Sequence, residues 1–555
     1  QGVKIFSLVS KQCRKEKYLI PLIKYKKEEN TVKYKTPKFE YEEEENLDLE
    51  DDDGYEGAIV LKPQPGIYLD TPVAVLDYAS LYPSSMISEN LSHDSIIMDE
   101  KYLGDEGIEN LKKIGYDYVD ITYDVFKWID PLIKSKGKMK TGVTTCRFAQ
   151  PEDGSKGVIP RILQDLLGAR KSTRKKIKTE PDPFKQSVLN GLQLAYKITA
   201  NSLYGQIGAK TSPIFLKDIA ASTTATGRKL LYLAKDKVKE KYEQAEIVYG
   251  DTDSIFVSYN PQDENGNPIK GKEGLAKSIE MGIESEKYIK QFLKPPHNLE
   301  YEKTFWPFVL FSKKRYIGNK YETDLDKYKQ TSMGIVLKRR DNANIVKIVY
   351  GGVIDIIINE KNIPKSIEFL KKSLIDLLNG KYGLDKLIIT KSLRAYYKNP
   401  ESIAHKVLAD RMGKRDPGNK PQSNDRIPYV YIQTNEKKGA KILQGDKVEH
   451  PKYIEENNIK IDYKFYITNQ IMKPVCQIYS LIVEDLEGFN KPKNYYDEKF
   501  KMLLKKQSFV KARDKINKLK NEEVEKLLFS EALRKANNQK NKVREITDFF
   551  RVNKK

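Results

Sequence analysis

The amino-acid sequence predicts an α+β protein of several domains, with strands rich in β-branched and aromatic residues and two long helices. Residues 246–249 and 255–257 have this strand character on either side of a glycine turn, which predicts a β-hairpin. Residues 160–178 and 183–205 have helical patterns separated by a proline-rich break, which predicts an antiparallel helix pair. A chain of 555 residues with 39% hydrophobic content is large enough to bury several cores.

The turn of the predicted hairpin carries two carboxylates, Asp251 and Asp253, two positions apart. If the hairpin is regular, alternation places both on one side. Two such charges raise each other's pKa, so a divalent cation such as Mg²⁺ is a physical reason to keep both. The alternative is a polar turn with two solvated acids.

A third acid, Asp77, follows the apolar strand Val73–Leu76, and Pro83 ends that segment shortly afterwards. An acid at a strand end is a second candidate for the same kind of site. Its presence favours metal binding over a solvated turn.

Between the acids, Lys197, Asn201 and Tyr204 recur at spacings of four and three residues, so one face of the second helix carries all three. A cation for phosphate, an amide and an aromatic ring for a base suit a nucleotide. A solvated lysine and an ordinary packing face remain the alternative.

The order of these motifs resembles family B DNA polymerases, most closely the delta-type replicative catalytic subunit, with a large DNA virus as a possible source. The resemblance runs from residue 1 to about 485. It implies a right-hand fold with an antiparallel palm sheet, helical fingers and a mostly helical thumb. The motifs that carry it are YEGA from Tyr55, DYASLYPSS from Asp77, GVIPR from Gly157, KITANSLYG from Lys197, YGDTDS from Tyr249, KKRY from Lys313 and LADRMGKRDPG from Leu408.

The resemblance and the shifts in composition together predict six segments. They are an N-terminal remnant with an acidic loop (1–54), a first palm part (55–156), fingers (157–210), a second palm part (211–395), a thumb (396–505) and a helical tail (506–555). The acidic run at 42–53 is expected to be a solvated surface insertion.

The implied reaction is template-directed addition of deoxynucleotides to a primer 3′-hydroxyl by two-metal phosphoryl transfer. Asp77 and Asp253 would bridge two Mg²⁺ ions, with the backbone carbonyl of Tyr78 completing the coordination. Asp251 is also catalytic in this interpretation but is the less direct ligand, and it could instead only shape the hairpin.

The remaining site residues are also carried over from the resemblance. Those expected to bind the incoming nucleotide are Ser80, Leu81, Tyr82, Arg170, Lys197, Asn201 and Tyr204. Tyr82 would be the steric gate against a 2′-hydroxyl, or else a core tyrosine. Those expected to contact DNA are Tyr55, Gly57, Gly205, Thr252, Lys313, Lys314, Arg315, Tyr316, Arg411, Lys414 and Arg415.

Composition agrees with primer–template DNA and deoxynucleoside triphosphates as partners, because the formal net charge is +21. The three cysteines show no paired spacing, so no zinc site or iron–sulfur cluster is expected and a reducing compartment is the simplest inference. The sequence has no long apolar stretch and no leader pattern, so a membrane is not expected as a partner. The expected location is intracellular, at replicating DNA in the nucleus or a viral factory.

Two expectations concern the ends of the chain. The family's 3′–5′ exonuclease domain has no counterpart before Gln1, so proofreading is not expected from this chain. At the other end, residues 543–550 resemble a sliding-clamp-binding peptide in which Ile546, Phe549 and Phe550 would fill an apolar pocket, although Val543 replaces the usual glutamine. The alternative is that these side chains fold back on the thumb.

Two other classes of function compete with this interpretation. A non-catalytic DNA-binding subunit would be expected to lose Asp77 and Asp253, which are both present. A palm-like cyclase or other template-free nucleotidyltransferase would lack the Lys197 helix and the basic thumb. Primer extension separates all three.

Overall fold

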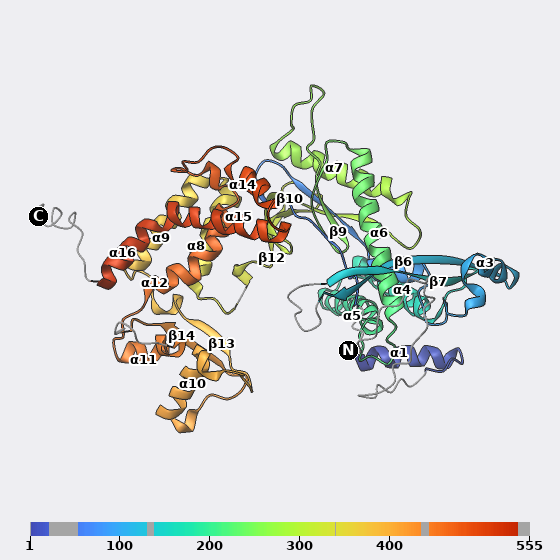
Figure 1. The fold of residues 1–555 in the computed structure, drawn as a ribbon, viewed down its shortest axis with the longest axis horizontal. Helices are drawn as coiled ribbons and strands as arrows, with labels where there is room; N and C mark the ends of the chain where they lie inside the picture. The colour runs from blue at the N-terminus through green and yellow to red at the C-terminus, as the bar shows by residue number, and fades with distance from the viewer. Residues whose placement is uncertain (1, 21–53, 130–137, 339, 435–442, 542–555) are drawn as a thin grey trace, which may run out of the picture. The chain divides into compact units, whose positions relative to one another are not determined.

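Two compact units form the chain in the computed structural model (Figure 1). The first unit comprises residues 1–62 and 73–304, and the second comprises 63–72 and 305–555. The structure describes residues 2–20, 54–129, 138–338, 340–434 and 443–541. No helix within these ranges is long and apolar enough to cross a membrane.

An antiparallel sheet organises the first unit. Strand β4 (Val73–Tyr78) pairs with β9 (Ser254–Ser258), β9 pairs with β8 (Glu246–Asp251), and β8 pairs with β2 (Val60–Leu61). The first four residues of β4 are all buried, because this apolar run lies inside the unit with both faces covered. The predicted hairpin at 246–257 is therefore confirmed.

The predicted helix pair is also confirmed, as α4 (Val158–Thr179) and α5 (Pro183–Ile207), which pack against each other. The Asp182 carboxylate accepts the Phe184 N–H and Pro183 opens α5, a combination typical of a helix N-terminus. The other helices of this unit are α1 (Gly2–Lys15), α2 (Leu81–Ser88), the 3₁₀ turn η1 (Glu100–Tyr102), α3 (Gly104–Lys113), α6 (Lys217–Lys241) and α7 (Gly271–Lys290).

A second sheet of the first unit is dominated by a long ribbon of β6 (Tyr116–Trp128) and β7 (Lys138–Pro151). The short strands β1 (Gly54–Tyr55) and β5 (Ile96–Ile97) flank it. The sequence analysis assigned this region to the first palm part and did not predict the ribbon.

Strand β10 (Leu299–Ser312) begins in the first unit and ends in the second. In the second unit its later residues pair with β3 (Gly66–Tyr68), and β11 (Arg315–Tyr321) pairs with β12 (Tyr328–Met333). A small sheet of β13 (Ile389–Ser392), β14 (Arg426–Tyr431) and β15 (Val448–Glu449) lies farther along the chain.

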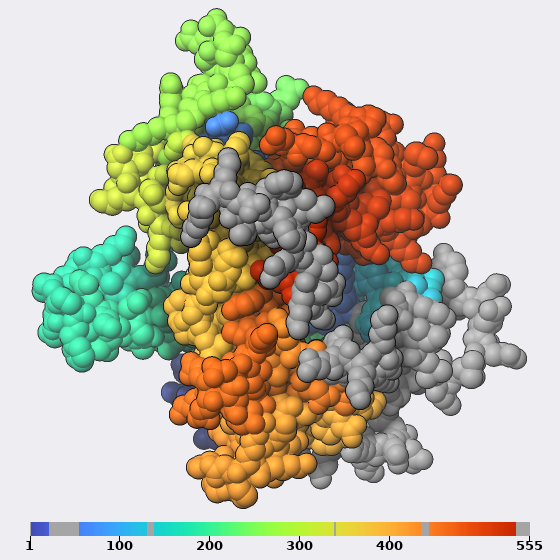
Figure 2. All heavy atoms as spheres, turned by 90° about the vertical axis from the view of Figure 1, so that its left-hand side faces the viewer, coloured from blue at the N-terminus to red at the C-terminus, as the bar shows by residue number. Residues whose placement is uncertain are grey.

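The rest of the second unit is mostly helical around one large apolar core. In the space-filling view its residues, yellow to red, face the reader (Figure 2). The α-helices are α8 (Asn344–Asp355), α9 (Ile363–Leu378), α10 (Ala404–Arg415), α11 (Pro451–Glu456), α12 (Tyr463–Phe465), α13 (Met472–Tyr479), α14 (Tyr495–Leu504), α15 (Phe509–Val524) and α16 (Ser530–Asn541). The shorter 3₁₀ and π segments are η3 (Val336–Lys338), η4 (Ile356–Glu360), η5 (Leu384–Lys386), η6 (Pro400–Ser402), η7 (Pro417–Asn419), η8 (Gln444–Lys447), η9 (Tyr466–Ile471), η10 (Val483–Asp485) and η11 (Glu525–Phe529).

The compact units divide at residue 304, inside the segment predicted as the second palm part, so the six-segment division stays a prediction. The charged helix formers after residue 505 do form helices, α15 and α16. The acidic run 42–53 and the clamp-binding-like residues Ile546, Phe549 and Phe550 lie outside the described residues.

Candidate active site

Asp77 and Asp253 lie beside each other at one end of the β4–β9 strand pair. Asp77 lies at the end of β4 opposite Ser254 of β9, and the Tyr78 N–H donates to the Asp253 carbonyl oxygen at 2.8 Å. The next backbone N–H, of Ala79, donates to the Asn298 carbonyl at 2.9 Å. The end of β4 and the turn that precedes β9 therefore hold the two acids that the sequence singled out.

Burial and mutual repulsion perturb both carboxylates. Desolvation, followed by the charges of Asp253 and Glu302, raises the pKa of Asp77 to about 7. Desolvation also raises the pKa of Asp253, with Asp251 as the principal like charge. Perturbed acids of this kind cluster at functional sites.

The turn between the strands is not regular. Thr252 has a φ of +59°, which a β-branched residue rarely adopts, and the Asp253 N–H donates to the Asp251 carbonyl at 2.6 Å. Regular alternation is therefore not the reason that Asp251 lies near Asp253. Asp251 itself ends β8 and its carboxylate accepts from the Thr252 hydroxyl at 3.2 Å.

Sequence reasoning missed a fourth acid at this centre, Glu302. Its charge raises the pKa of both Asp77 and Asp253, whereas Lys197 and Lys303 lower the pKa of Asp77. Lys303 lies 2.9 Å from the Glu302 carboxylate. The alternation along β10 gave no signal for Glu302, because Glu300 and Glu302 look alike in sequence.

The residues present fit a hard divalent cation. Within the described ranges, no group of three or more His, Cys, Asp or Glu side chains is arranged to hold a metal ion. Mg²⁺ does not need such a cage, since it keeps waters and uses one or two carboxylates together with substrate phosphates. Two desolvated carboxylates with raised pKa values are suitable donors, because bound cation charge offsets their repulsion.

A cationic group on helix α4 lies beside the turn after β4. The Arg170 guanidinium lies 3.4 Å from the Ser80 hydroxyl and 3.3 Å from the side-chain oxygen Oε1 of Gln193 on α5. Ser80 has a φ of +55°, so this turn is held in a conformation that serine seldom adopts. The structure thus brings together two of the predicted nucleotide-binding residues.

Two predicted aromatic residues also meet. The Tyr82 and Tyr204 rings are 4.6 Å apart between centroids, and burial raises the pKa of both hydroxyls, that of Tyr82 to about 12. Gly227 of α6 explains the space for Tyr82, because a Cβ there would lie 3.0 Å from the ring. Leu81, by contrast, is buried in the core.

The segment Tyr55–Gly57 is held by a second residue that sequence reasoning missed, Arg228. Arg228 Nη1 donates to the carbonyl oxygens of Glu56 and Gly57, at 2.5 and 2.9 Å. The Thr224 hydroxyl donates to the same Glu56 oxygen at 2.9 Å. Tyr55 in turn hydrogen-bonds Tyr204, which joins this segment to the aromatic pair.

The other predicted residues of α5 are exposed. Lys197, Asn201 and Gly205 present themselves to solvent on the helix, while Tyr204 is half-buried. The helix spacing therefore placed the first two on an accessible face, and Lys197 is near enough to the acids to lower their pKa.

The predicted DNA-contacting group at residues 313–316 lies in the second unit. Lys313 and Lys314 are exposed at the β10–β11 turn, where Lys314 has a φ of +60°. Arg315 donates to the Gln477 side chain at 2.7 Å. Tyr316 is buried against Phe305 and Phe308 in the sheet.

The three basic residues predicted on α10 differ in their surroundings. Arg415 makes a bidentate pair with the buried Glu449, at 3.1 and 2.9 Å, and Arg411 donates to the Gly445 carbonyl at 3.1 Å. Lys414 is exposed. Both guanidinium groups therefore bind other parts of the protein, and no local pattern in the sequence indicates these long-range contacts.

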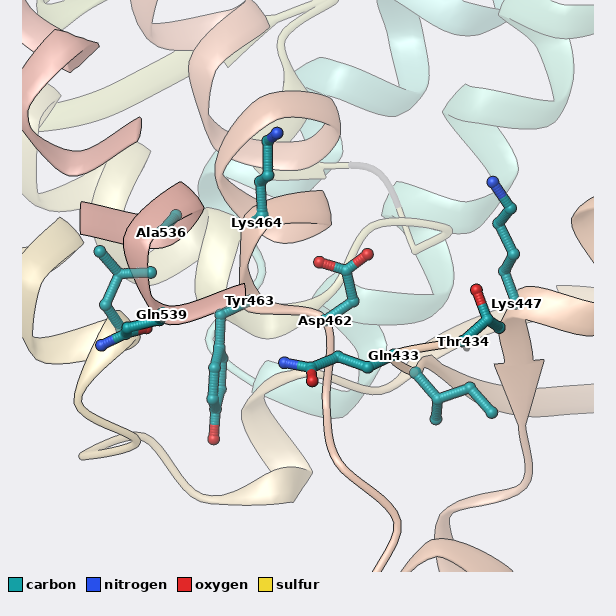
Figure 3. A pocket seen from close by; sticks show the side chains of 10 residues that line it. Gln433, Thr434, Lys447, Asp462, Tyr463, Lys464, Ala536 and Gln539 are labelled. Carbon is teal, nitrogen blue, oxygen red and sulfur yellow. The ribbon is translucent and has the colours of Figure 1, made fainter. Parts of the chain in front are cut away.

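A small pocket of about 50 Å³ lies elsewhere in the second unit, between the end of β14 and helices α12 and α16 (Figure 3). Its labelled side chains include Gln433, Asp462 and Lys447. This volume holds only a few waters. The pocket is far too small for a nucleotide. Its lining residues are also far along the chain from Asp77 and Asp253.

The chain belongs to DNA polymerase family B, whose family model matches residues 1–482. A DNA polymerase of Pyramimonas orientalis virus is 50% identical over all of this chain and 46% of its own length. The DNA polymerase delta catalytic subunit of Candida albicans is 35% identical over 86% of this chain and 40% of its own.

A solved structure supports the fold. The family B DNA polymerase of the archaeon Pyrobaculum calidifontis superposes with a TM-score of 0.55 at 22% identity, over 89% of this chain and 51% of that one. The chain spans about half the length, or less, of these curated relatives. The resemblance to the family, with its viral and delta-type members, is therefore confirmed.

Proposed function

We propose that this chain is the polymerase core of a replicative DNA polymerase, which adds deoxynucleotides to a primer 3′-hydroxyl under the direction of a template. The observation that carries the proposal is the pair Asp77 and Asp253, desolvated at the end of β4 and in the turn before β9, with Lys197 close enough to lower the pKa of both. Family membership supports the same assignment.

Asp77, Asp253 and the Tyr78 carbonyl would hold two Mg²⁺ ions, which supply Lewis-acid activation of the primer hydroxyl and charge neutralisation at the triphosphate. The protein's own part is to fix these oxygens. Hydrogen bonds from Tyr78 N–H and Ala79 N–H lock the end of β4 against Asp253 and Asn298. Asp251 would assist as the less direct acid.

Arg170 and Lys197 would bind the β- and γ-phosphates, because a guanidinium fork suits two oxygens and an ammonium acts as a point charge. Ser80, with Leu81 setting the backbone, would complete the phosphate site, and Asn201 would align the triphosphate. Tyr82 would lie under the sugar and exclude a 2′-hydroxyl. Tyr204 and Gly205 would face the new base pair.

Duplex DNA must be held without sequence readout, which calls for backbone contacts. The proposed contacts are Tyr55, Gly57, Thr252, Lys313, Lys314, Arg315, Tyr316, Arg411, Lys414 and Arg415. The structure supports direct contact best for the exposed lysines Lys313, Lys314 and Lys414. For Tyr316, Arg411 and Arg415 it supports a role in shaping the surface.

Replication inside the host cell, in a nucleus or viral factory, is proposed as the setting. A sliding clamp is the proposed further partner, through Ile546, Phe549 and Phe550. Deleting residues 543–555 should leave short-gap filling unchanged and abolish stimulation by the cognate clamp. Equal stimulation of the truncated chain would refute this assignment.

Primer extension with single-turnover kinetics tests the central proposal. Asp253→Asn should lower the rate at least about a thousandfold, since several kcal/mol of transition-state stabilisation would be lost. Binding of primer–template, measured by fluorescence anisotropy, should stay within about twofold of the parent chain. Near-normal turnover in Asp253→Asn would refute the two-metal assignment.

A further inference from the structure

The turn between α14 and α15 lies beyond residue 482, where the match to the family model ends. The alignment with the viral relative that is 50% identical covers all of this chain. Residues 501–515, named here the basic–apolar turn, carry four exposed apolar side chains, Met502, Leu504, Phe509 and Val510, of which Met502 is 64% exposed. In Figure 1 the two helices, drawn in red, lie side by side.

Three of these apolar side chains are exposed and are not packed into the core of the unit. Helix α14 packs inward through Tyr496, Phe500 and Leu503, and α15 through Ala512 and Ile516, at the usual spacing of three and four residues. Met502 and Val510 fall outside both patterns. Leu504 follows Phe500 by four residues, but it is the last residue of α14 and its side chain is 40% exposed. Phe509 closes the turn against Phe500, with ring centroids 5.5 Å apart.

Basic side chains surround this apolar group. Lys505, Lys506, Lys511 and Lys515 are exposed, and none makes an ion pair with a described residue. Asp514 is the one acid within the basic–apolar turn, and it pairs with its neighbour Arg513 at 3.2 Å. The turn therefore presents uncompensated positive charge around exposed apolar area.

We propose that the basic–apolar turn docks an acidic peptide segment of a partner protein, which covers Met502, Leu504 and Val510 with aliphatic side chains and pairs its carboxylates with the lysines. Clustered exposed apolar groups with a polar rim mark protein interfaces. The charge of the rim would steer an acidic partner into place. Duplex DNA is the less suitable occupant, because phosphate contacts would satisfy the lysines and leave the apolar side chains in water.

The test uses the whole chain and a fluorescein-labelled synthetic peptide in which leucines alternate with glutamates. Anisotropy should show saturable binding that weakens with salt. Leu504→Ser combined with Val510→Ser should weaken it about tenfold, and Lys505→Gln combined with Lys506→Gln should weaken it by a similar factor. The controls Met333→Ser and Lys372→Gln, exposed residues of the same unit, should have no effect.

Two further measurements make the outcome decisive. A peptide with serine in place of leucine should bind about tenfold more weakly, and primer extension on naked DNA should be unchanged in the turn variants. Equal peptide binding by the parent chain and the Ser variants would overturn the proposal. The proposal would also be overturned if the Lys variants lost binding of duplex DNA while the Ser variants bound duplex DNA as the parent chain does. That result would mean that the turn contacts DNA. Neither result depends on polymerase activity.

Discussion

Arg228 contacts Glu56 twice: Nη1 donates to the Glu56 backbone carbonyl at 2.5 Å, and Nε lies 3.3 Å from its carboxylate. The guanidinium is 11% exposed and also holds the Gly57 carbonyl. Helix α6 thereby fixes the segment whose Tyr55 reaches Tyr204. One arginine couples the predicted template contact to the predicted nucleotide site.

Replacing Arg228 with methionine should therefore affect both sites. We expect roughly 2 kcal/mol lower stability, because charge-assisted hydrogen bonds to two carbonyls are lost, and about tenfold weaker primer–template binding. Glu56→Gln removes only the carboxylate contact and should change DNA binding by less than about twofold. Denaturant titration and anisotropy measure the two effects. Equal DNA affinity in Arg228→Met would show that the segment is held without it.

Tyr82 and Gly227 give a paired prediction on sugar selection. Tyr82→Ala should raise ribonucleotide incorporation relative to deoxyribonucleotide by at least about tenfold, since the ring would no longer fill the space beneath the sugar. Gly227→Ala places a Cβ 3.0 Å from the ring and should also alter discrimination, by displacing Tyr82. Single-nucleotide kinetics with both sugars measures the ratio. Unchanged discrimination in Tyr82→Ala would make Tyr82 a packing residue.

Asp77 should destabilise the metal-free protein at neutral and alkaline pH. The pKa of Asp77 in the folded protein, about 7, lies above the ordinary value of 3.8. The contribution of Asp77 to the free energy of unfolding is therefore fully present below pH 3.8 and is lost as the pH rises to 7. Asp77→Asn should stabilise the chain at pH 8 in a chelator by up to about 4 kcal/mol, and by clearly less at pH 5. Mg²⁺ should stabilise the parent chain more than the variant. Urea midpoints of both proteins are measured at pH 8 and pH 5. The prediction is contradicted if Asp77→Asn is not more stable than the parent chain at either pH.

His297 should have the opposite pH dependence. It is buried, its Nε2 lies 3.0 Å from the Ser88 hydroxyl, and desolvation lowers its pKa to about 4. A depressed pKa contributes stability above pH 6.5 that is lost as pH falls towards 4. Between pH 7.5 and 4, the free energy of unfolding of His297→Gln should therefore fall by about 3 kcal/mol less than that of the parent chain. Parallel stability curves for the two proteins would show that His297 does not titrate in this range.

The hairpin and the α4–α5 pair were predictable because strand alternation, a glycine turn, an N-cap and prolines are local signals. Asp77 and Asp253 were found through their positions at strand ends. Glu302 and Arg228 were not, because their partners lie far along the chain and only folding brings them together. Strand β6, in contrast, carries a local signal that would have predicted it, because Val119, Ile121, Tyr123 and Val125 alternate with polar residues.

Helix α10 shows the same limit and supplies a final prediction. A basic run beside Asp416-Pro417-Gly418 predicted a grip on DNA, but Arg415 pairs with Glu449, which is 4% exposed and lies in β15. Removing one partner of a buried pair leaves an uncompensated charge and typically costs about 3–5 kcal/mol. Arg415→Gln should approach the lower end of this range, because the arginine side chain is 37% exposed and Arg411 remains 3.6 Å from Glu449.

Lys414→Gln is the matched control, because Lys414 is exposed on the same helix. It should leave stability within about 0.5 kcal/mol of the parent chain. If Lys414 contacts a phosphate, the plot of log K for primer–template binding against log salt concentration should become less steep by about 0.9 in Lys414→Gln. Arg415→Gln should change that slope less than Lys414→Gln while lowering the urea midpoint. A full loss of slope in Arg415→Gln with unchanged stability would instead make Arg415 a direct DNA contact, and the Glu449 pair incidental.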